Sequence, residues 1–122
     1  QIDENTYPYK IGFDSCTVPG LINSCKNIAI DSFDTCEAAR WSAYITADMK
    51  MLPCSFDNQA QNWSVDLKTT SIQEAWNSTT FDEFRNYFLK ACPKCKDRNG
   101  CLGGCPISPE IILCEKKRKR GQ

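Results

Sequence analysis

Nine cysteines and no histidine stand out in this chain of 122 residues. A chain this rich in sulfur uses it for disulfides, for zinc or for iron–sulfur clusters. Without histidine, a zinc site would need a shell of thiolates or carboxylates alone, whereas a [4Fe-4S] cluster ordinarily takes four thiolates. Disulfides, zinc and iron–sulfur clusters are therefore the three chemistries to distinguish.

Five of the cysteines form a dense run near the C-terminus. They lie within 23 residues, in the pattern Cys92-x2-Cys95-x5-Cys101-x3-Cys105-x8-Cys114. A C-x2-C pair lets two thiolates point at one centre from a single turn, and the glycines within the run let the backbone fold tightly around bulky inorganic sulfur. Two further cysteines, Cys36 and Cys54, flank a predicted β-hairpin upstream.

The elements expected to position these cysteines are short. Apolar and polar residues alternate over 41–46 and the chain returns through 50–54, which predicts the β-hairpin. Residues 9–13 alternate loosely in the manner of a short strand. Residues 21–30 carry apolar side chains for little more than one helical turn and are predicted to be irregular. The Asn- and Gln-rich stretch 55–70 is predicted to be loop.

Two capping boxes predict two short helices between the hairpin and the cysteine run. Ser71 and Glu74 form an S-x-x-E box ahead of an apolar stretch, and Thr80 and Glu83 repeat the device. The second helix is expected to end near Lys90. The cysteine run itself is mostly Cys, Gly, Pro, Lys and Asp, so bonds to something other than regular structure must hold it together.

These spacings resemble the SPASM domain, the C-terminal iron–sulfur domain of radical S-adenosylmethionine enzymes. Every cysteine spacing of that pattern is met between Cys36 and Cys114, while Met49 occupies the family's glycine position. Several flanking strings are also similar to the family: Leu52-Pro53-Cys54, Ser71-Ile-Gln-Glu-Ala-Trp-Asn-Ser78, Phe81-x2-Phe84-Arg85 and Cys101-Leu-Gly-Gly-Cys105-Pro106.

The resemblance implies two [4Fe-4S] clusters with interleaved ligands. The second cluster would be held by Cys92, Cys95, Cys101 and Cys114, and the first by Cys36, Cys54 and Cys105. The first cluster then lacks a fourth thiolate, and Cys16 and Cys25 remain. We favour Cys16, which ends the strand-like segment. Cys25 lies nearer in sequence, and an open iron site is the third alternative.

The fold expected from these features is small α+β, with a β-hairpin, two short helices and a Cys-rich C-terminal loop built around two metal clusters. Residues 1–33 are expected to lead out of an upstream barrel. Residues 34–114 would form the SPASM-like domain, and residues 115–122 a basic disordered tail. Cluster ligation would replace the apolar burial that the cysteine run cannot provide.

For function, the resemblance implies an accessory domain of a radical S-adenosylmethionine enzyme that modifies a peptide or protein. Its partners would be that substrate and the upstream barrel, which would bind S-adenosylmethionine. The domain would relay electrons and help to position the substrate. The catalytic motif C-x3-C-x2-C is absent from the 122 residues, so we do not expect this chain to be catalytic alone.

Two other interpretations fit part of the pattern. A non-enzymatic, zinc-binding interaction module would also use C-x2-C with further cysteines. A secreted disulfide domain would account for two glycosylation sequons, Asn62-Trp63-Ser64 and Asn77-Ser78-Thr79. Nine cysteines would leave one of them unpaired in such a domain. Trp41, Trp63 and Trp76 either line a peptide groove or belong to the core, and for Trp76 we favour the core.

The charge distribution argues against a nucleic-acid partner. The formal net charge is zero, but residues 115–122 hold five of the 15 basic residues and one of the 15 acidic ones. Residues 1–114 therefore hold 10 basic and 14 acidic residues, a net charge of −4. An acidic body lacks the basic face that binds phosphates. The sequence shows no signal peptide and no membrane span, so we expect a soluble, cytoplasmic protein.

Overall fold

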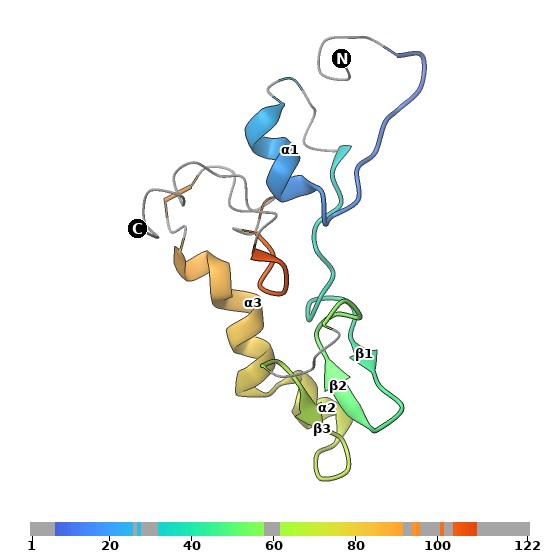
Figure 1. Ribbon diagram of the computed structural model, residues 1–122, viewed down its shortest axis with the longest axis vertical. Coiled ribbons are helices and arrows are strands. Elements are labelled where there is room, and N and C mark those ends of the chain that lie inside the picture. The colour runs from blue at the N-terminus through green and yellow to red at the C-terminus, as the bar shows by residue number, and fades with distance from the viewer. Residues whose placement is uncertain are drawn as a thin grey trace. The chain divides into compact units, whose positions relative to one another are not determined.

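The chain divides into two compact units, residues 37–90 and residues 1–36 together with 91–122. The computed structural model describes residues 7–25, 27, 32–57, 62–91, 94–95, 101 and 104–109. Its elements, labelled in Figure 1, are α1 (Val18–Ser24), β1 (Tyr44–Ile45), β2 (Lys50–Leu52), β3 (Val65–Asp66), α2 (Ile72–Trp76) and α3 (Thr79–Ala91).

A three-stranded antiparallel sheet in the order β1-β2-β3 forms one side of the 37–90 unit. Tyr44 pairs with Leu52 across β1 and β2, which confirms the predicted hairpin. Lys50 pairs with Asp66 across β2 and β3. The prediction of loop throughout 55–70 was wrong for β3, because a two-residue strand is formed by pairing with its neighbour rather than by a pattern of its own.

The turn between β1 and β2 keeps a glycine-like conformation at Met49. The Met49 N–H donates to the Thr46 carbonyl over 3.0 Å, and the Thr46 N–H donates to the Lys50 carbonyl over 2.9 Å. Met49 has φ 67°, in the left-handed region. A three-residue turn that ends in a left-handed residue is a β-bulge turn that normally uses glycine. Met49 therefore holds a conformation that normally uses glycine, the residue of the family pattern at this position.

One capping box lies as predicted and the other does not. The Glu74 N–H donates to Ser71 Oγ over 3.2 Å, and the Ser71 N–H donates to Glu74 Oε2 over 2.9 Å, so α2 begins at a complete box. The prediction that Thr80 caps the next helix was wrong, because Thr80 lies inside α3. Ser78 precedes α3, and its hydroxyl accepts from the Phe81 N–H over 3.4 Å. The end of α3 agrees with the sequence prediction.

The core of the 37–90 unit lies between the sheet and the two helices that follow it. Its buried apolar residues are Ala38, Ala39, Met51, Leu52, Pro53, Ala75, Phe81 and Phe84. Neighbouring positions on β2 are both buried, so this central strand is covered on both faces. Phe81 and Phe84 lie three residues apart on α3 and share its buried face.

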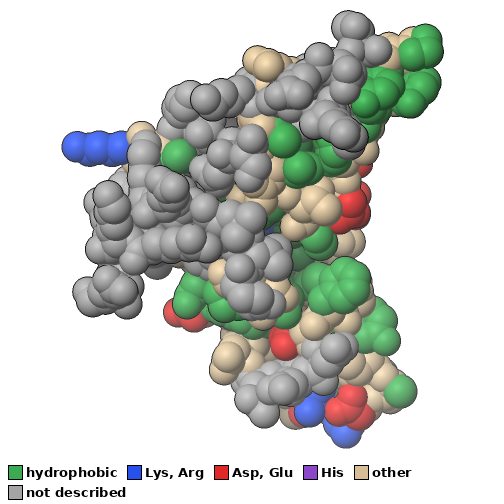
Figure 2. All heavy atoms as spheres, turned by 45° about the horizontal axis from the view of Figure 1, so that its top comes forward, with side chains coloured by type: hydrophobic (Ala, Val, Ile, Leu, Met, Phe, Trp, Pro, Cys, Tyr) green, Lys and Arg blue, Asp and Glu red, His purple; other side chains and the backbone are tan. Residues whose placement is uncertain are grey.

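Two of the three tryptophans contribute to packing. Trp63 meets Phe84 edge to face with ring centroids 5.4 Å apart, and Trp76 lies 5.9 Å from Phe81. Trp41 is 78% exposed. Figure 2 shows that hydrophobic side chains reach the surface on the face drawn. Trp76 packs against the buried Phe81 but is itself half-buried, so it lies at the edge of the core that was predicted for it.

In the other unit, a parallel bridge between Phe13 and Phe33 leads into α1. The predicted strand over 9–13 is thus reduced to one bridged residue. The prediction of irregular structure over 21–30 was wrong at its start, because α1 extends to Ser24. Pro19 lies in the first helical turn, where its missing N–H costs nothing and its fixed φ favours a helix. Within the described residues, no helix has the length and apolar character needed to cross a membrane.

Candidate metal centre

Seven of the nine cysteines lie in the part of the chain that the structure describes. All seven are thiols, namely Cys16, Cys25, Cys36, Cys54, Cys95, Cys101 and Cys105. Cys92 and Cys114, two expected ligands of the second cluster, lie outside the described residues. Cys54 belongs to the 37–90 unit, and the other six belong to the second unit. Among the described side chains, no three carboxylates or thiols are gathered around one point.

The backbone brings Cys16 and Cys36 near each other. Phe13 and Phe33 are parallel bridge partners, and the Phe13 N–H donates to the Ser32 carbonyl over 2.8 Å. Cys16 and Cys36 each follow a bridged phenylalanine by three residues. Cys16 lies in the turn that follows Phe13, close enough to Cys36 for the two charges to interact.

Cys16 and Cys25 lie at opposite ends of α1. The Cys16 N–H donates to Asp14 Oδ1 over 2.9 Å in the turn before the helix. The Cys25 N–H donates to the Leu21 carbonyl over 2.8 Å and closes the last turn. Because α1 has seven residues, its axis is about 10 Å long at the usual rise per residue. The two candidates for the fourth position thus have different surroundings.

Cys16 is exposed, but partial desolvation raises the pKa of its thiol, and the charge of Asp14 raises it further. A hydrogen bond to Asp14 acts in the same direction, a hydrogen bond to Ser15 opposes it, and the neighbouring Cys36 adds a small increase. These surroundings favour the protonated thiol in the metal-free chain. A metal ion reverses that preference, because it binds the thiolate and releases the proton.

Cys101 and Cys105 bracket a tight turn. The Gly104 N–H donates to the Cys101 carbonyl over 3.0 Å. Gly104 has φ 113°, which side chains of L-residues rarely adopt. Gly104 thus has a backbone conformation suited to glycine, while the other two glycines of the run, Gly100 and Gly103, lie outside the described residues. Cys95, Cys101 and Cys105 are half-buried.

Cys54 shares a turn with a carboxylate that sequence reasoning missed. The Asp57 N–H donates to the Cys54 carbonyl over 3.2 Å, so the two residues lie at the ends of one turn. Asp57 Oδ2 is buried and has no hydrogen-bond partner in the described part of the chain. The sequence did contain a signal for Asp57: Cys54 and Asp57 are separated by two residues, as are the two ligands of a C-x2-C pair. An unpartnered buried carboxylate oxygen is compatible with a nearby metal or its ligands.

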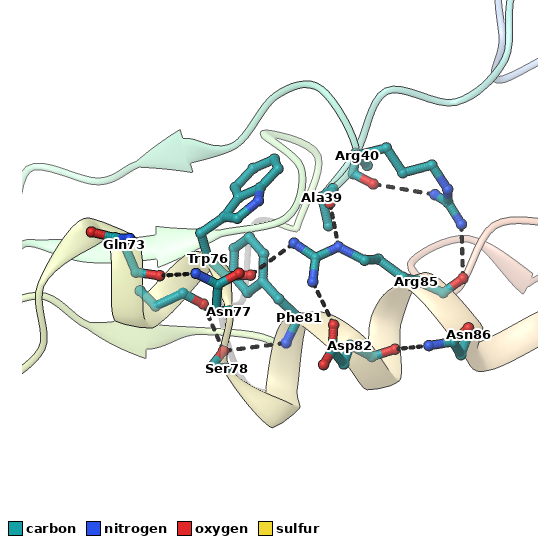
Figure 3. A network of polar contacts seen from close by, with 12 residues as sticks. Ala39, Arg40, Gln73, Trp76, Asn77, Ser78, Phe81, Asp82, Arg85 and Asn86 are labelled. Atoms are coloured by element: carbon teal, nitrogen blue, oxygen red, sulfur yellow. Dashed lines mark hydrogen bonds and ion pairs between the residues drawn. The ribbon is translucent and has the colours of Figure 1, made fainter.

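Arg85 on α3 is the centre of a polar network in the 37–90 unit (Figure 3). Its guanidinium donates to the Ala39 carbonyl over 2.6 Å and to the Trp76 carbonyl over 2.7 Å. It also pairs with Asp82 over 2.6 Å, and it lies 5.0 Å from the centre of the Trp76 ring. Arg40 donates in turn to the Arg85 carbonyl over 2.8 Å. This network joins α2 and α3 to the loop that follows Cys36.

A family model described as the SPASM iron–sulfur cluster-binding domain matches residues 36–101, which is just over half of the chain. The chain belongs to the SPASM family. No curated protein and no solved structure matches it. The resemblance inferred from the cysteine spacings is thereby confirmed, and the chain is an iron–sulfur cluster-binding domain.

The match to the SPASM domain includes five of the eight predicted ligands, Cys36, Cys54, Cys92, Cys95 and Cys101. The remaining three, Cys16, Cys105 and Cys114, lie outside the matched residues. The donor set suits an iron–sulfur cluster, because the chain offers many thiols and no imidazole. The orphaned oxygen of Asp57 beside Cys54 is a further feature that suits a metal-binding SPASM domain.

Arg85 was visible in the sequence only as the last residue of a family-like string. Nothing in residue type or spacing indicates that its partners are backbone carbonyls of Ala39 and Trp76, since the former lies 46 residues away. Such contacts depend on tertiary packing. The network around Arg85 is therefore a property of this SPASM domain that required the structure.

Proposed function

We propose that this SPASM domain holds two [4Fe-4S] clusters as auxiliary centres of a radical S-adenosylmethionine enzyme acting on a peptide or protein. The second cluster would take the thiolates of Cys92, Cys95, Cys101 and Cys114. The first would take those of Cys16, Cys36, Cys54 and Cys105. When bound, such clusters supply one-electron transfer at potentials tuned by their surroundings.

The observation that supports the proposal is that Phe13 bridges Phe33 and that Cys16, three residues after Phe13, is close enough to Cys36 for their charges to interact. The family spacing provides seven thiolates, and Cys16 brings the number to eight. Since each cubane cluster takes four thiolates, eight correspond to two complete clusters. Cys25 closes the far end of α1, which supports its being the cysteine left over.

The proposed role in substrate positioning is supported by β1. This strand is at the edge of the sheet, and Tyr44 and Ile45 are 46% and 43% exposed. Edge strands carry unpaired backbone groups to which an extended peptide can add as a further strand. A peptide bound there would have two apolar side chains beside it.

Anaerobic reconstitution with iron and sulfide tests the number and type of clusters. We expect brown protein with about eight irons per chain. Colourless protein that binds zinc in whole-number ratio and takes up no iron would overturn the proposal. About four irons per chain would limit it to one cluster.

Two matched variants test the fourth ligand of the first cluster. Cys16→Ala should lower the iron content toward about four per chain, because a cubane that loses one thiolate is held less firmly. Cys25→Ala removes a thiol from the other end of the same helix and should leave the iron content unchanged. The opposite result would assign the ligand to Cys25, and no loss in either variant would leave the iron open or bound by another group.

The enzyme context is tested separately from the metal. The gene sequence upstream of Gln1 is expected to encode a C-x3-C-x2-C motif. A reading frame in which no such motif is joined to this domain, or encoded beside it, would contradict the proposed role in radical chemistry. It would leave the cluster-binding result intact.

A further inference from the structure

The loop at residues 37–42 begins directly after Cys36 and is held by its own backbone. The Glu37 carbonyl accepts from the N–H groups of Arg40 over 2.9 Å, Trp41 over 2.9 Å and Ser42 over 3.2 Å. Ala39 at its centre has φ 57° and is fully buried. A non-glycine residue holds that conformation only when its surroundings impose it.

Ala39 connects this loop to the backbone beside Cys54. Its N–H is shared between the Ser42 carbonyl, 3.0 Å away, and the Pro53 carbonyl, 3.2 Å away. Pro53 is fully buried and immediately precedes Cys54. The peptide group before the ligand is therefore tied to Ala39, and a displacement of Ala39 would displace Cys54 as well.

The other side of Ala39 is held by Arg85. The Ala39 carbonyl accepts from Arg85 Nε over 2.6 Å, while Arg85 Nη2 donates to the Trp76 carbonyl over 2.7 Å. The planar guanidinium presents several donors in a fixed fork, and it lies over the rings of Trp76 and Phe81. Lysine has a single ammonium group and cannot reproduce two such bonds together with the stacking.

We propose that Arg85 is a positioning residue for the first cluster. Through its hydrogen bond to Ala39, and that of Ala39 to Pro53, Arg85 holds Cys54 in place before metal is bound. The inference rests on the proposed function, because it assumes that Cys54 is a ligand. Arg85 is not proposed as a ligand, because its guanidinium donates to the Ala39 and Trp76 carbonyls and to Asp82. In this proposal the helices α2 and α3 anchor Arg85, and Arg85 fixes the loop at residues 37–42.

Arg85→Lys is the central test, carried out on the full chain after anaerobic reconstitution. We expect iron to fall from about eight toward about four per chain. The electron paramagnetic resonance spectrum and midpoint potential of the first cluster should change, whereas those of the second cluster should stay as in the wild type. Arg85→Ala should give the larger loss of iron. Circular dichroism of each metal-free variant reports whether the helices have remained folded.

Phe84→Leu is the matched control for simple loss of stability. Phe84 neighbours Arg85 on α3 and is buried against Trp63, but it takes no part in the hydrogen bonds to Ala39. This variant should lower the melting temperature and leave the potential of the first cluster unchanged. Asp82→Asn weakens the ion pair and keeps both carbonyl bonds of Arg85, so it should retain all its iron.

Three results would overturn the inference. The first is an Arg85→Lys variant, folded by circular dichroism, with wild-type iron and an unchanged first cluster. The second is an equal change of the first cluster in Phe84→Leu, which would reduce Arg85 to a stabilising residue. The third is the same change in Asp82→Asn, which would assign the effect to charge. If the wild type itself takes up no iron, the proposed function fails before Arg85 is tested.

Discussion

Met49 offers a direct test of how the hairpin turn is built. Its φ of 67° lies in the left-handed region, at the position where the family pattern has glycine. Glycine enters this region without steric cost, whereas other L-residues are disfavoured there by roughly 1–2 kcal/mol. Met49→Gly should therefore remove strain from the turn without changing its hydrogen bonds.

The expected magnitude follows from a comparison of Met49→Gly with Met49→Ala. Both variants remove a side chain that is 46% exposed, so any packing lost is the same in each. Relative to the alanine variant, the glycine variant avoids roughly 1–2 kcal/mol of backbone strain in the folded state. It loses about 0.4–1 kcal/mol of stability, because glycine gives the unfolded chain greater conformational freedom. The glycine variant should thus be more stable by about 0.5–1 kcal/mol. In ordinary strand or helix positions the order of glycine and alanine is the reverse.

Thermal unfolding of the metal-free variants, followed by circular dichroism, measures this difference. A gain of that size corresponds to a melting temperature higher by roughly 4 °C in a domain of this size. Urea titration should give the same order of stability, with an unchanged dependence on denaturant. A Met49→Gly variant no more stable than Met49→Ala would refute the assignment of strain to this turn.

Three further predictions concern Glu74, Gly104 and Asp57. Hydrogen bonds from the Ser71 hydroxyl and N–H lower the pKa of Glu74 below its ordinary value of 4.5, so its contribution to the free energy of unfolding is complete above that pH and is lost as the pH falls through the lower folded-state pKa. Glu74→Gln should flatten this acid dependence in urea titrations on either side of pH 4.5, and an unchanged slope would contradict the capping box. Gly104→Ala places a side chain at φ 113°, which costs roughly 1–3 kcal/mol, and it should release cluster iron to a chelator faster than the wild type; an equal rate would show that the turn adapts. Asp57→Asn should raise the stability of the metal-free chain by roughly 1 kcal/mol, because it neutralises a buried, unpartnered oxygen. Loss of iron in that variant would make Asp57 a ligand.

The parts of the fold that could be predicted from the sequence are those that local residues determine. The hairpin follows from alternation around its turn, and α2 follows from Ser71 and Glu74, which form their hydrogen bonds within one helical turn. The family spacing of the cysteines is likewise a property of the linear chain. Each of these signals lies within a short stretch and needs no tertiary contact.

The remaining features depend on contacts between distant residues. The strand β3 exists through its pairing with β2, and α1 begins with Pro19 in its first turn, where the apolar pattern of residues 21–30 gives no signal. Ser78, rather than Thr80, lies at the start of α3 as its cap. The Ser78 hydroxyl also donates to the Ala75 carbonyl over 2.7 Å, a contact that holds it between α2 and α3. For the site, the bridge between Phe13 and Phe33 supports Cys16 as the fourth ligand, an alternative that the spacing alone did not distinguish from Cys25.

The left-handed, fully buried conformation of Ala39 restricts which amino acids relatives can carry there. A larger side chain would have to find room in a closed core and would adopt a disfavoured φ at the same time, so substitution should be limited to alanine and glycine. A small residue three positions after the cysteine that corresponds to Cys36 would then be a recognisable mark in sequence searches. It could separate SPASM domains that share this loop from those that build the same cluster on a different backbone.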